Sequence, residues 1–172
     1  MGYTGDGGSA SSAELSSPTG LGVDSAGNVY VADTGNYAIR RISVGGTITT
    51  VAGTGERGQS NDGGPAASAA LVYPVSLGLD SDGDLFIVDQ GDQRIRRVRP
   101  DGTIDTVAGW GQVYLLGQSG PPAIVDGGPG FLIPVSPQGV SVDSEGNLYI
   151  GAGNGGSARA QYFEAVVPDL RN

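Results

Sequence analysis

Short runs of alternating apolar and polar residues follow one another along this chain, and Gly, Asn or Asp separates them. GLGVD ends at the turn SAGN, and VYVAD, YAIRRISV and TITTVAG follow it. Period-two runs rich in Val, Ile, Tyr and Thr are typical of antiparallel β-strands. The segment PAASAALVYP has room for one helical turn at most. The pattern predicts strands at 20–24, 28–33, 37–43 and 47–52, then at 76–80, 84–89, 94–99 and 103–108.

The second group of predicted strands repeats the first. Asp24, Asp80 and Asp143 occupy equivalent points of three copies, and the second interval is slightly longer than the first. Other landmarks share the first interval: Val51 with Val107, and Asp6 with Asp62, which Asp126 follows after a longer one. A lone four-stranded sheet leaves both faces bare, and radial stacking of repeated sheets buries them. The repeat therefore predicts an all-β fold of four-stranded antiparallel propeller blades.

The period divides the chain into about three blades within one repeat domain, residues 1–172. We assign a connector to 1–17, a first blade to 18–53, a connector to 54–74, a second blade to 75–109, an enlarged connector to 110–137 and a degenerate third blade to 138–172. The segments DGGSA, DGGPA and DGGPG read as connector turns, because no helix or Walker-type lysine follows them.

The repeated segments resemble the NHL repeat in its long bacterial form, in which TVAGTG and DGGPA join the blades. The residues that carry this resemblance are 18–42, 50–74, 76–98, 106–109, 126–128 and 139–150. The resemblance implies a β-propeller. It does not imply one activity, since propellers host binding scaffolds and enzymes alike.

The third copy departs from the pattern. The shift that carries Asp80 onto Asp143 places Ala152 where the earlier copies have Asp33 and Asp89. It also places Arg159 at the position of Arg40 and Arg96. Closed propellers have about 4–8 blades, so three blades form an incomplete ring. Three interpretations remain open: a piece of a longer chain, closed self-assembly, or an open array.

Composition and charge exclude several classes of site. The 172 residues contain no Cys and no His. This excludes disulfides, thiol nucleophiles, catalytic triads that use His, and metal sites with Cys or His ligands. Nine basic residues against eighteen acidic ones give a net charge of −9, so the sequence predicts no nucleic-acid binding. Apolar runs are too short for membrane insertion, and the first residues lack the basic and apolar regions of a signal peptide.

Two turns gather oxygen-bearing side chains, at 33–36 and 89–92. Such residues commonly bond their own backbone, and Asp33 and Asp89 could each pair with an arginine on the next strand, Arg40 or Arg96. The alternative interpretation is a Ca²⁺ site, since carboxylates and carbonyls are its preferred ligands. We predict no resident cofactor and no metal site, and keep Asp33 and Asp89 as speculative binding residues.

Trp110 and Tyr114 lie in the enlarged connector and are the remaining binding candidates. Aromatic side chains beside a Gly/Pro-rich loop suit a glycan platform or a protein anchor, or they cover a blade junction. No residue is singled out as catalytic. The first strand of each blade is the inner strand, nearest the axis of a propeller. These inner strands offer mainly Gly, Leu, Val and Ser, with Asp24, Asp80 and Asp143 at their ends.

These observations favour a non-enzymatic propeller scaffold that binds protein or glycan, or self-assembles through open blade faces. The chain is expected to be a homo-oligomer or part of a longer chain. The acidity, the absence of Cys and the abundance of Gly, Ser and Thr favour an extracellular or cell-envelope location in bacteria. The alternative function is a fragment of a propeller enzyme of the lactonase, lyase or glycosidase type, with an oxygen-ligated metal or a carboxylate site.

Overall fold

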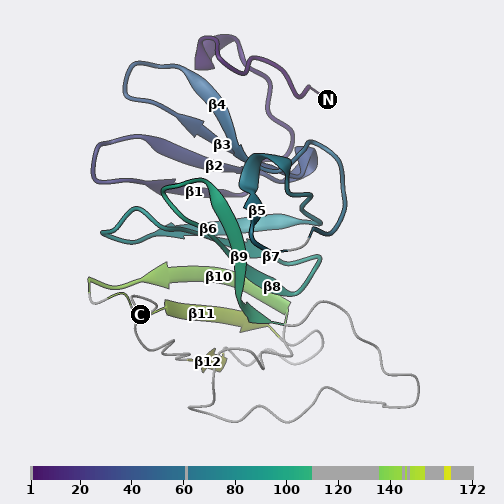
Figure 1. The fold of residues 1–172 in the computed structure, drawn as a ribbon, viewed down its shortest axis with the longest axis vertical. Helices are drawn as coiled ribbons and strands as arrows, with labels where there is room; N and C mark the ends of the chain where they lie inside the picture. The colour runs from purple at the N-terminus through teal and green to yellow at the C-terminus, as the bar shows by residue number, and fades with distance from the viewer. Residues whose placement is uncertain are drawn as a thin grey trace.

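A computed structural model describes residues 2–60, 62–109, 136–144, 146, 148–153 and 161–163. Figure 1 shows three antiparallel sheets stacked one on the next, with the first sheet at the top and the third at the bottom. The N-terminal segment, drawn in purple, lies beside the outer strand of the first sheet (Figure 1). The described part of the chain is all-β, as predicted, and its sheets stack face to face as blades do.

The first sheet contains four strands in sequence order: β1 (Gly20–Val23), β2 (Val29–Asp33), β3 (Ala38–Ile42) and β4 (Ile48–Ala52). Each predicted strand is present, with small differences at its ends. The turn between β1 and β2 needs a left-handed backbone at Gly27, which has φ +85°. The same position is Gly83 in the second sheet and Gly146 in the third, with φ of +89° and +85°.

The second sheet has five strands rather than the predicted four. Its strands in spatial order are β5 (Gly64–Pro65), β9 (Thr103–Gly109), β8 (Arg94–Val98), β7 (Leu85–Asp89) and β6 (Pro74–Leu79). The prediction that DGGPA forms only a turn is wrong, since its Gly-Pro pair extends the sheet as β5. One helical turn follows, η3 (Ala66–Ser68).

The N-terminal segment bonds along the outer strand of the first sheet, β4, in the way that β5 bonds along β9 in the second. Gly7 N donates to Ile48 O at 2.8 Å, and Gly63 N donates to Ile104 O at 2.8 Å, one repeat period further along the chain. A helical turn, η1 (Ala10–Ser12), takes the position of η3. Each described connector therefore belongs structurally to the blade that follows it.

The third sheet contains β10 (Ser136–Val142), β11 (Leu148–Gly153) and β12 (Gln161–Phe163). Its register corrects one prediction. Val31 pairs with Arg40 and Ile87 with Arg96, but the equivalent Ile150 pairs with Phe163. Phe163 therefore replaces Arg159 at this position, because the chain between β11 and β12 is longer than the constant shift assumed.

Two hydrophobic clusters join the three sheets. The first joins residues of the first sheet to the second sheet and its connector, and includes Ala32, Ile39, Ala52, Ala66, Ala69, Leu71, Leu77 and Ile87. The second joins the second and third sheets, and includes Phe86, Val88, Ile95, Val107, Leu148 and Ile150. Removal of these side chains from water is the main force that holds the stack together.

Candidate functional site

The predicted pairing of Asp33 with Arg40 is present. Arg40 lies on β3 with 1% of its side chain exposed, and its Nη1 lies 3.4 Å from Oδ2 of the fully buried Asp33. Asp33 also accepts hydrogen bonds from Ser16 N at 2.7 Å and Asn36 Nδ2 at 2.9 Å. These contacts tie the turn after β2 to the connector and to β3, which supports a structural use of this carboxylate.

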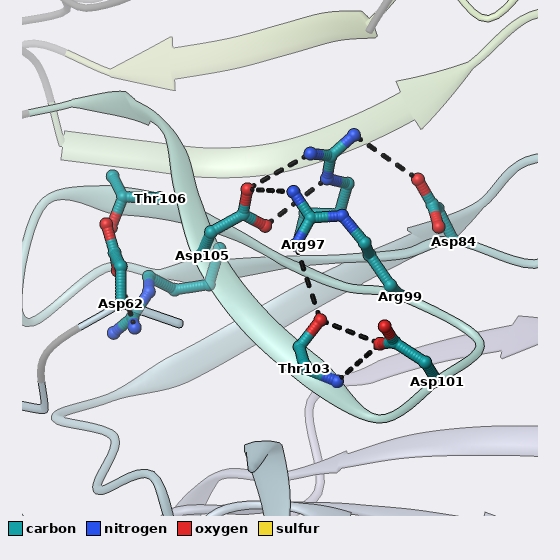
Figure 2. A network of polar contacts seen from close by, with 9 residues as sticks. Asp62, Asp84, Arg97, Arg99, Asp101, Thr103, Asp105 and Thr106 are labelled. Atoms are coloured by element: carbon teal, nitrogen blue, oxygen red, sulfur yellow. Dashed lines mark hydrogen bonds and ion pairs between the residues drawn. The ribbon is translucent and has the colours of Figure 1, made fainter. Parts of the chain in front are cut away.

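Asp6 is a second partner of Arg40 that the sequence analysis missed. Arg40 Nη2 lies 2.6 Å from Asp6 Oδ1, while Asp6 Oδ2 accepts a hydrogen bond from Thr50 N at 3.0 Å. Burial acts to raise the pKa of Asp6, but the hydrogen bonds from Thr50 and Arg40 outweigh it, so the pKa is lowered. Figure 2 shows Asp62 beside Thr106, which donates to it at 3.0 Å in the equivalent arrangement of the second blade. Asp6 and Asp62 share the repeat period, and this signal could have revealed both.

The second blade holds its buried arginine differently. Arg96 pairs with Asp62 at 3.1 Å, and no hydrogen bond joins it to Asp89 in the described part of the chain. Asp89 instead accepts from the backbone N–H groups of Val72 and Tyr73, at 3.0 and 2.7 Å. The predicted hydrogen bond between Asp89 and Arg96 is therefore not found, although the charge of Arg96 still acts on Asp89.

A buried aspartate, Asp92, stands where the first blade has Asn36. Gln59 Nε2 donates to Asp92 Oδ1, and Arg94 Nε lies 3.3 Å from Asp92 Oδ2. Burial raises the pKa of Asp89, and the charge of Asp92 raises it further, against the opposing hydrogen bonds of Tyr73 and Val72. The turn at 89–92 therefore holds two carboxylates, Asp89 and Asp92, where the turn at 33–36 holds a carboxylate and an amide.

A network of charged side chains lies at the end of the second blade away from the turn at 89–92. Figure 2 shows Arg97 between Asp84 and Asp105, with Arg99 reaching the same Asp105. The Arg97–Asp105 and Arg99–Asp105 ion pairs measure 3.0 and 2.7 Å. Burial raises the pKa of Asp84, and the neighbouring Asp80 adds to the rise. In the first blade Thr49 and Ser43 replace Asp105 and Arg99, so the first blade lacks this network.

The aspartates that end the inner strands organise their own turns. Asp24 Oδ1 accepts from Ala26 N and Asn28 N at 3.0 and 2.8 Å. Asp80 Oδ1 accepts from Asp82 N and Asp84 N at 3.0 and 2.8 Å. In the described part of the chain, no group of three or more acidic side chains is placed to hold a metal ion.

Trp110 and Tyr114 lie outside the described residues, so their binding role remains a prediction. Among the residues that the structure describes, no helix is long and apolar enough to cross a membrane.

The most distinctive exposed feature is the open face of the first blade. We call a sheet's side toward the preceding blade its leading face, and the opposite side its trailing face. On β1, Leu21 and Val23 point to the leading face and are 70% and 62% exposed. Their equivalents on β6 are Leu77, which is 5% exposed, and Leu79, which packs against the first hydrophobic cluster.

The connectors differ in exposure in the same way as the strands β1 and β6. Ala66, Ala69 and Leu71 are buried in the first cluster, at 1%, 3% and 0% exposure. The equivalent residues of the N-terminal segment are only half-buried: Ala10, Ala13 and Leu15. The open leading face therefore comprises Leu21 and Val23 of β1 together with Ala10, Ala13 and Leu15. Its residues have the chemistry of a blade-to-blade contact.

Part of the amino-acid sequence is similar to that of known proteins. A family model described as the Teneurin NHL domain matches residues 2–60. Human teneurin-4 is 36% identical over 100 residues, which cover 51% of this chain and 4% of teneurin-4. The chain thus spans a small part of the curated relatives that it matches.

Solved structures resemble the fold. An auxiliary nutrient-binding protein from Bacteroides thetaiotaomicron has a TM-score of 0.59 and 20% identity, over 77% of this chain and 34% of that one. A gluconolactonase from Xanthomonas campestris has a TM-score of 0.51 and 14% identity, over 85% of this chain and 38% of that one. Both binding proteins and enzymes therefore share this architecture, and the likeness extends to the fold alone.

Proposed function

We propose that this chain, which belongs to the NHL-repeat β-propeller family, is a non-enzymatic scaffold that binds protein through its open leading face. The exposure of Leu21 and Val23 carries this proposal. Large apolar side chains gathered on one exposed face are typical of a protein contact. The same residue positions make a protein contact inside this chain, where the second blade meets the first.

The carboxylates of the described blades support a non-enzymatic role. Asp33 and Asp89 are fully buried and accept hydrogen bonds from their own blade and connector. Asp24 and Asp80 bond the turns that they begin. A catalytic acid or base needs a free approach to substrate. Burial denies this approach to Asp33 and Asp89, and the turn hydrogen bonds engage Oδ1 of Asp24 and Asp80. We further propose that the chain needs no resident cofactor.

The composition supports an extracellular or cell-envelope location, which we propose on that basis. A tagged full-length protein should then be found outside the cytoplasm on cell fractionation. Recovery in the cytoplasmic fraction alone would contradict the location and leave the binding proposal standing.

Site-specific photo-cross-linking tests the binding proposal. A photoreactive phenylalanine analogue replaces Leu21, and the labelled protein is illuminated in an extract of its source cells. We expect covalent adducts whose tryptic peptides belong to a protein, either a second copy or another chain. Val44, 72% exposed on the turn after β3, provides the matched control. Its equivalent, Pro100, is exposed in the second blade, so this position is not a blade contact.

Equal labelling at positions 21 and 44, or adducts that contain glycan without peptide, would contradict the proposal. A parallel assay addresses the enzyme alternative. Lactone and glycoside substrates are incubated with the protein, with and without Ca²⁺ and Mg²⁺. We expect no hydrolysis above the rate without protein, and turnover that Asp24→Asn or Asp80→Asn removes would overturn the non-enzymatic assignment.

A further inference from the structure

The contact between the first two blades shows what a leading face is built to meet. Leu77 is buried against the trailing face of β1, where a Cβ at Gly22 would collide with its side chain. A Cβ at Gly20 would lie 2.8 Å from the carbonyl oxygen of Val75 on β6. Glycine on the trailing face therefore makes room for aliphatic side chains from the next leading face.

The second and third blades use the same contact. Val140 and Val142 of β10 stand at the positions of Leu77 and Leu79, and both pack against the cluster that contains Phe86 and Val88. A Cβ at Gly78 would lie 3.5 Å from Val142 Cγ2. One type of interface thus occurs twice, always from a leading face to a trailing face.

The third sheet has a trailing face of the same type, on which no other described segment packs. The positions of Gly20, Gly22, Tyr30 and Ala32 are taken there by Gly139, Ser141, Tyr149 and Gly151. Among the described residues, nothing lies within 4 Å of a Cβ built on Gly139. Tyr149 is 38% exposed, and its hydroxyl donates to Asp143 at 3.0 Å.

We propose that the open leading face of one chain packs on the trailing face of the third sheet of a second copy. This proposal rests on the proposed protein-binding function and names its partner. The contact is head-to-tail, so each copy uses one face of each kind. Two chains of three blades would supply six, which lies within the 4–8 blades of closed propellers.

Three variants and light scattering on a size-exclusion column test the proposal. The full chain should form a species of at least twice the mass of one chain, in a concentration-dependent manner. Leu21→Asp introduces a charge on the leading face, and Gly139→Leu fills the open space on the trailing face. Each should weaken association at least about tenfold. Val44→Asp adds the same charge outside the interface and should leave the mass unchanged.

A mixture of the two interface variants distinguishes head-to-tail packing from other geometries. Leu21→Asp retains an intact trailing face, and Gly139→Leu retains an intact leading face. The mixture should therefore form a heterodimer through one contact, although each variant alone is monomeric. If Gly139→Leu associates as the full chain does, the leading faces pack on each other or elsewhere, and head-to-tail packing is wrong.

The two proposals can fail separately. Circular dichroism confirms that each variant retains its β-sheet signal before its mass is interpreted. A monomeric full chain that still cross-links at position 21 to a different protein would overturn self-association and support the protein-binding function. A monomeric chain without protein adducts at position 21 would overturn both.

Discussion

At the scale of single residues, buried arginines connect each blade to its connector. Arg40 and Arg96 are 1% and 0% exposed, and both reach an aspartate in the connector that precedes their blade. An ionised side chain removed from water needs such a partner, because loss of one member leaves the other charge unpaired. The connector is therefore fixed by charge as well as by backbone pairing.

Asp6→Ala should lower the free energy of unfolding by about 1–3 kcal/mol, below the cost for a fully buried pair, because the Asp6 side chain is 49% exposed. Exposed Glu56→Ala is the control and should change it by about 0.5 kcal/mol or less. The folded state lowers the pKa of Asp6, so its contribution is present above the unfolded value of 3.8 and is lost as pH falls through the lowered pKa. Urea unfolding at neutral and acidic pH should show the difference between Asp6→Ala and the parent protein shrinking in acid.

The exchange of Asn36 for Asp92 between the two blades gives a second prediction. Asn36 Nδ2 donates to Asp33 Oδ2, whereas Asp92 places a second carboxylate beside Asp89. Asp92→Asn also removes the ion pair with Arg94, whose side chain is 26% exposed. One added hydrogen bond and one lost repulsion should outweigh that loss, so the variant should be more stable by about 0.5–1 kcal/mol at neutral pH.

The pH dependence of that variant follows from Asp89. Burial and Asp92 raise its pKa in the folded state, so the folded protein binds the proton more tightly, and stability falls as pH rises from 3.8 through the raised pKa. Asp92→Asn should reduce this fall. Denaturant midpoints between about pH 3 and pH 7 measure it. An equal fall in both proteins would show that Asp92 does not act on Asp89.

At the scale of elements, the sequence predicts strands better than contacts between distant segments. The eight predicted strands are present because alternation and Gly turns are local signals. β5 was missed because a Gly-Pro pair gains strand character only by pairing with β9, which lies far along the chain. Phe163 was missed because a constant shift cannot reveal that more residues separate β12 from β11 than separate the equivalent strands. The Asp33–Arg40 pair was predictable from residue type. Residue type alone does not reveal that the equivalent Asp89 bonds the backbone of Val72 and Tyr73 instead.

Equivalent glycines on the trailing faces should differ in tolerance. Gly20→Ala places a Cβ 2.8 Å from the backbone oxygen of Val75, so it should cost about 1–3 kcal/mol in unfolding free energy. Gly139→Ala meets open space among the described residues and should cost about 1 kcal/mol or less. Thermal denaturation of both variants at one protein concentration compares them. Equal destabilisation would contradict the close approach of β1 and β6.

At the scale of the whole molecule, charge opposes the proposed self-association. Each chain carries a net charge of −9, so two copies repel each other at long range while apolar side chains favour contact. Raising the salt concentration from about 0.01 M to about 1 M shortens the screening length from about 30 Å to about 3 Å. Association measured by light scattering should strengthen over this range. Weakening by salt would indicate that ion pairs, rather than Leu21 and Val23, hold the copies together.

The placement of each connector on the following blade has a consequence for synthesis. Asp62 leaves the ribosome before Thr106, its partner on β9, at a sequence separation of 44. At about 5–20 residues per second, this delay is roughly 2–9 s. During that time the connector can already lie on the finished first blade, where Ala66, Ala69 and Leu71 are buried. Each completed blade would thus serve as a template on which the nascent chain begins the next one.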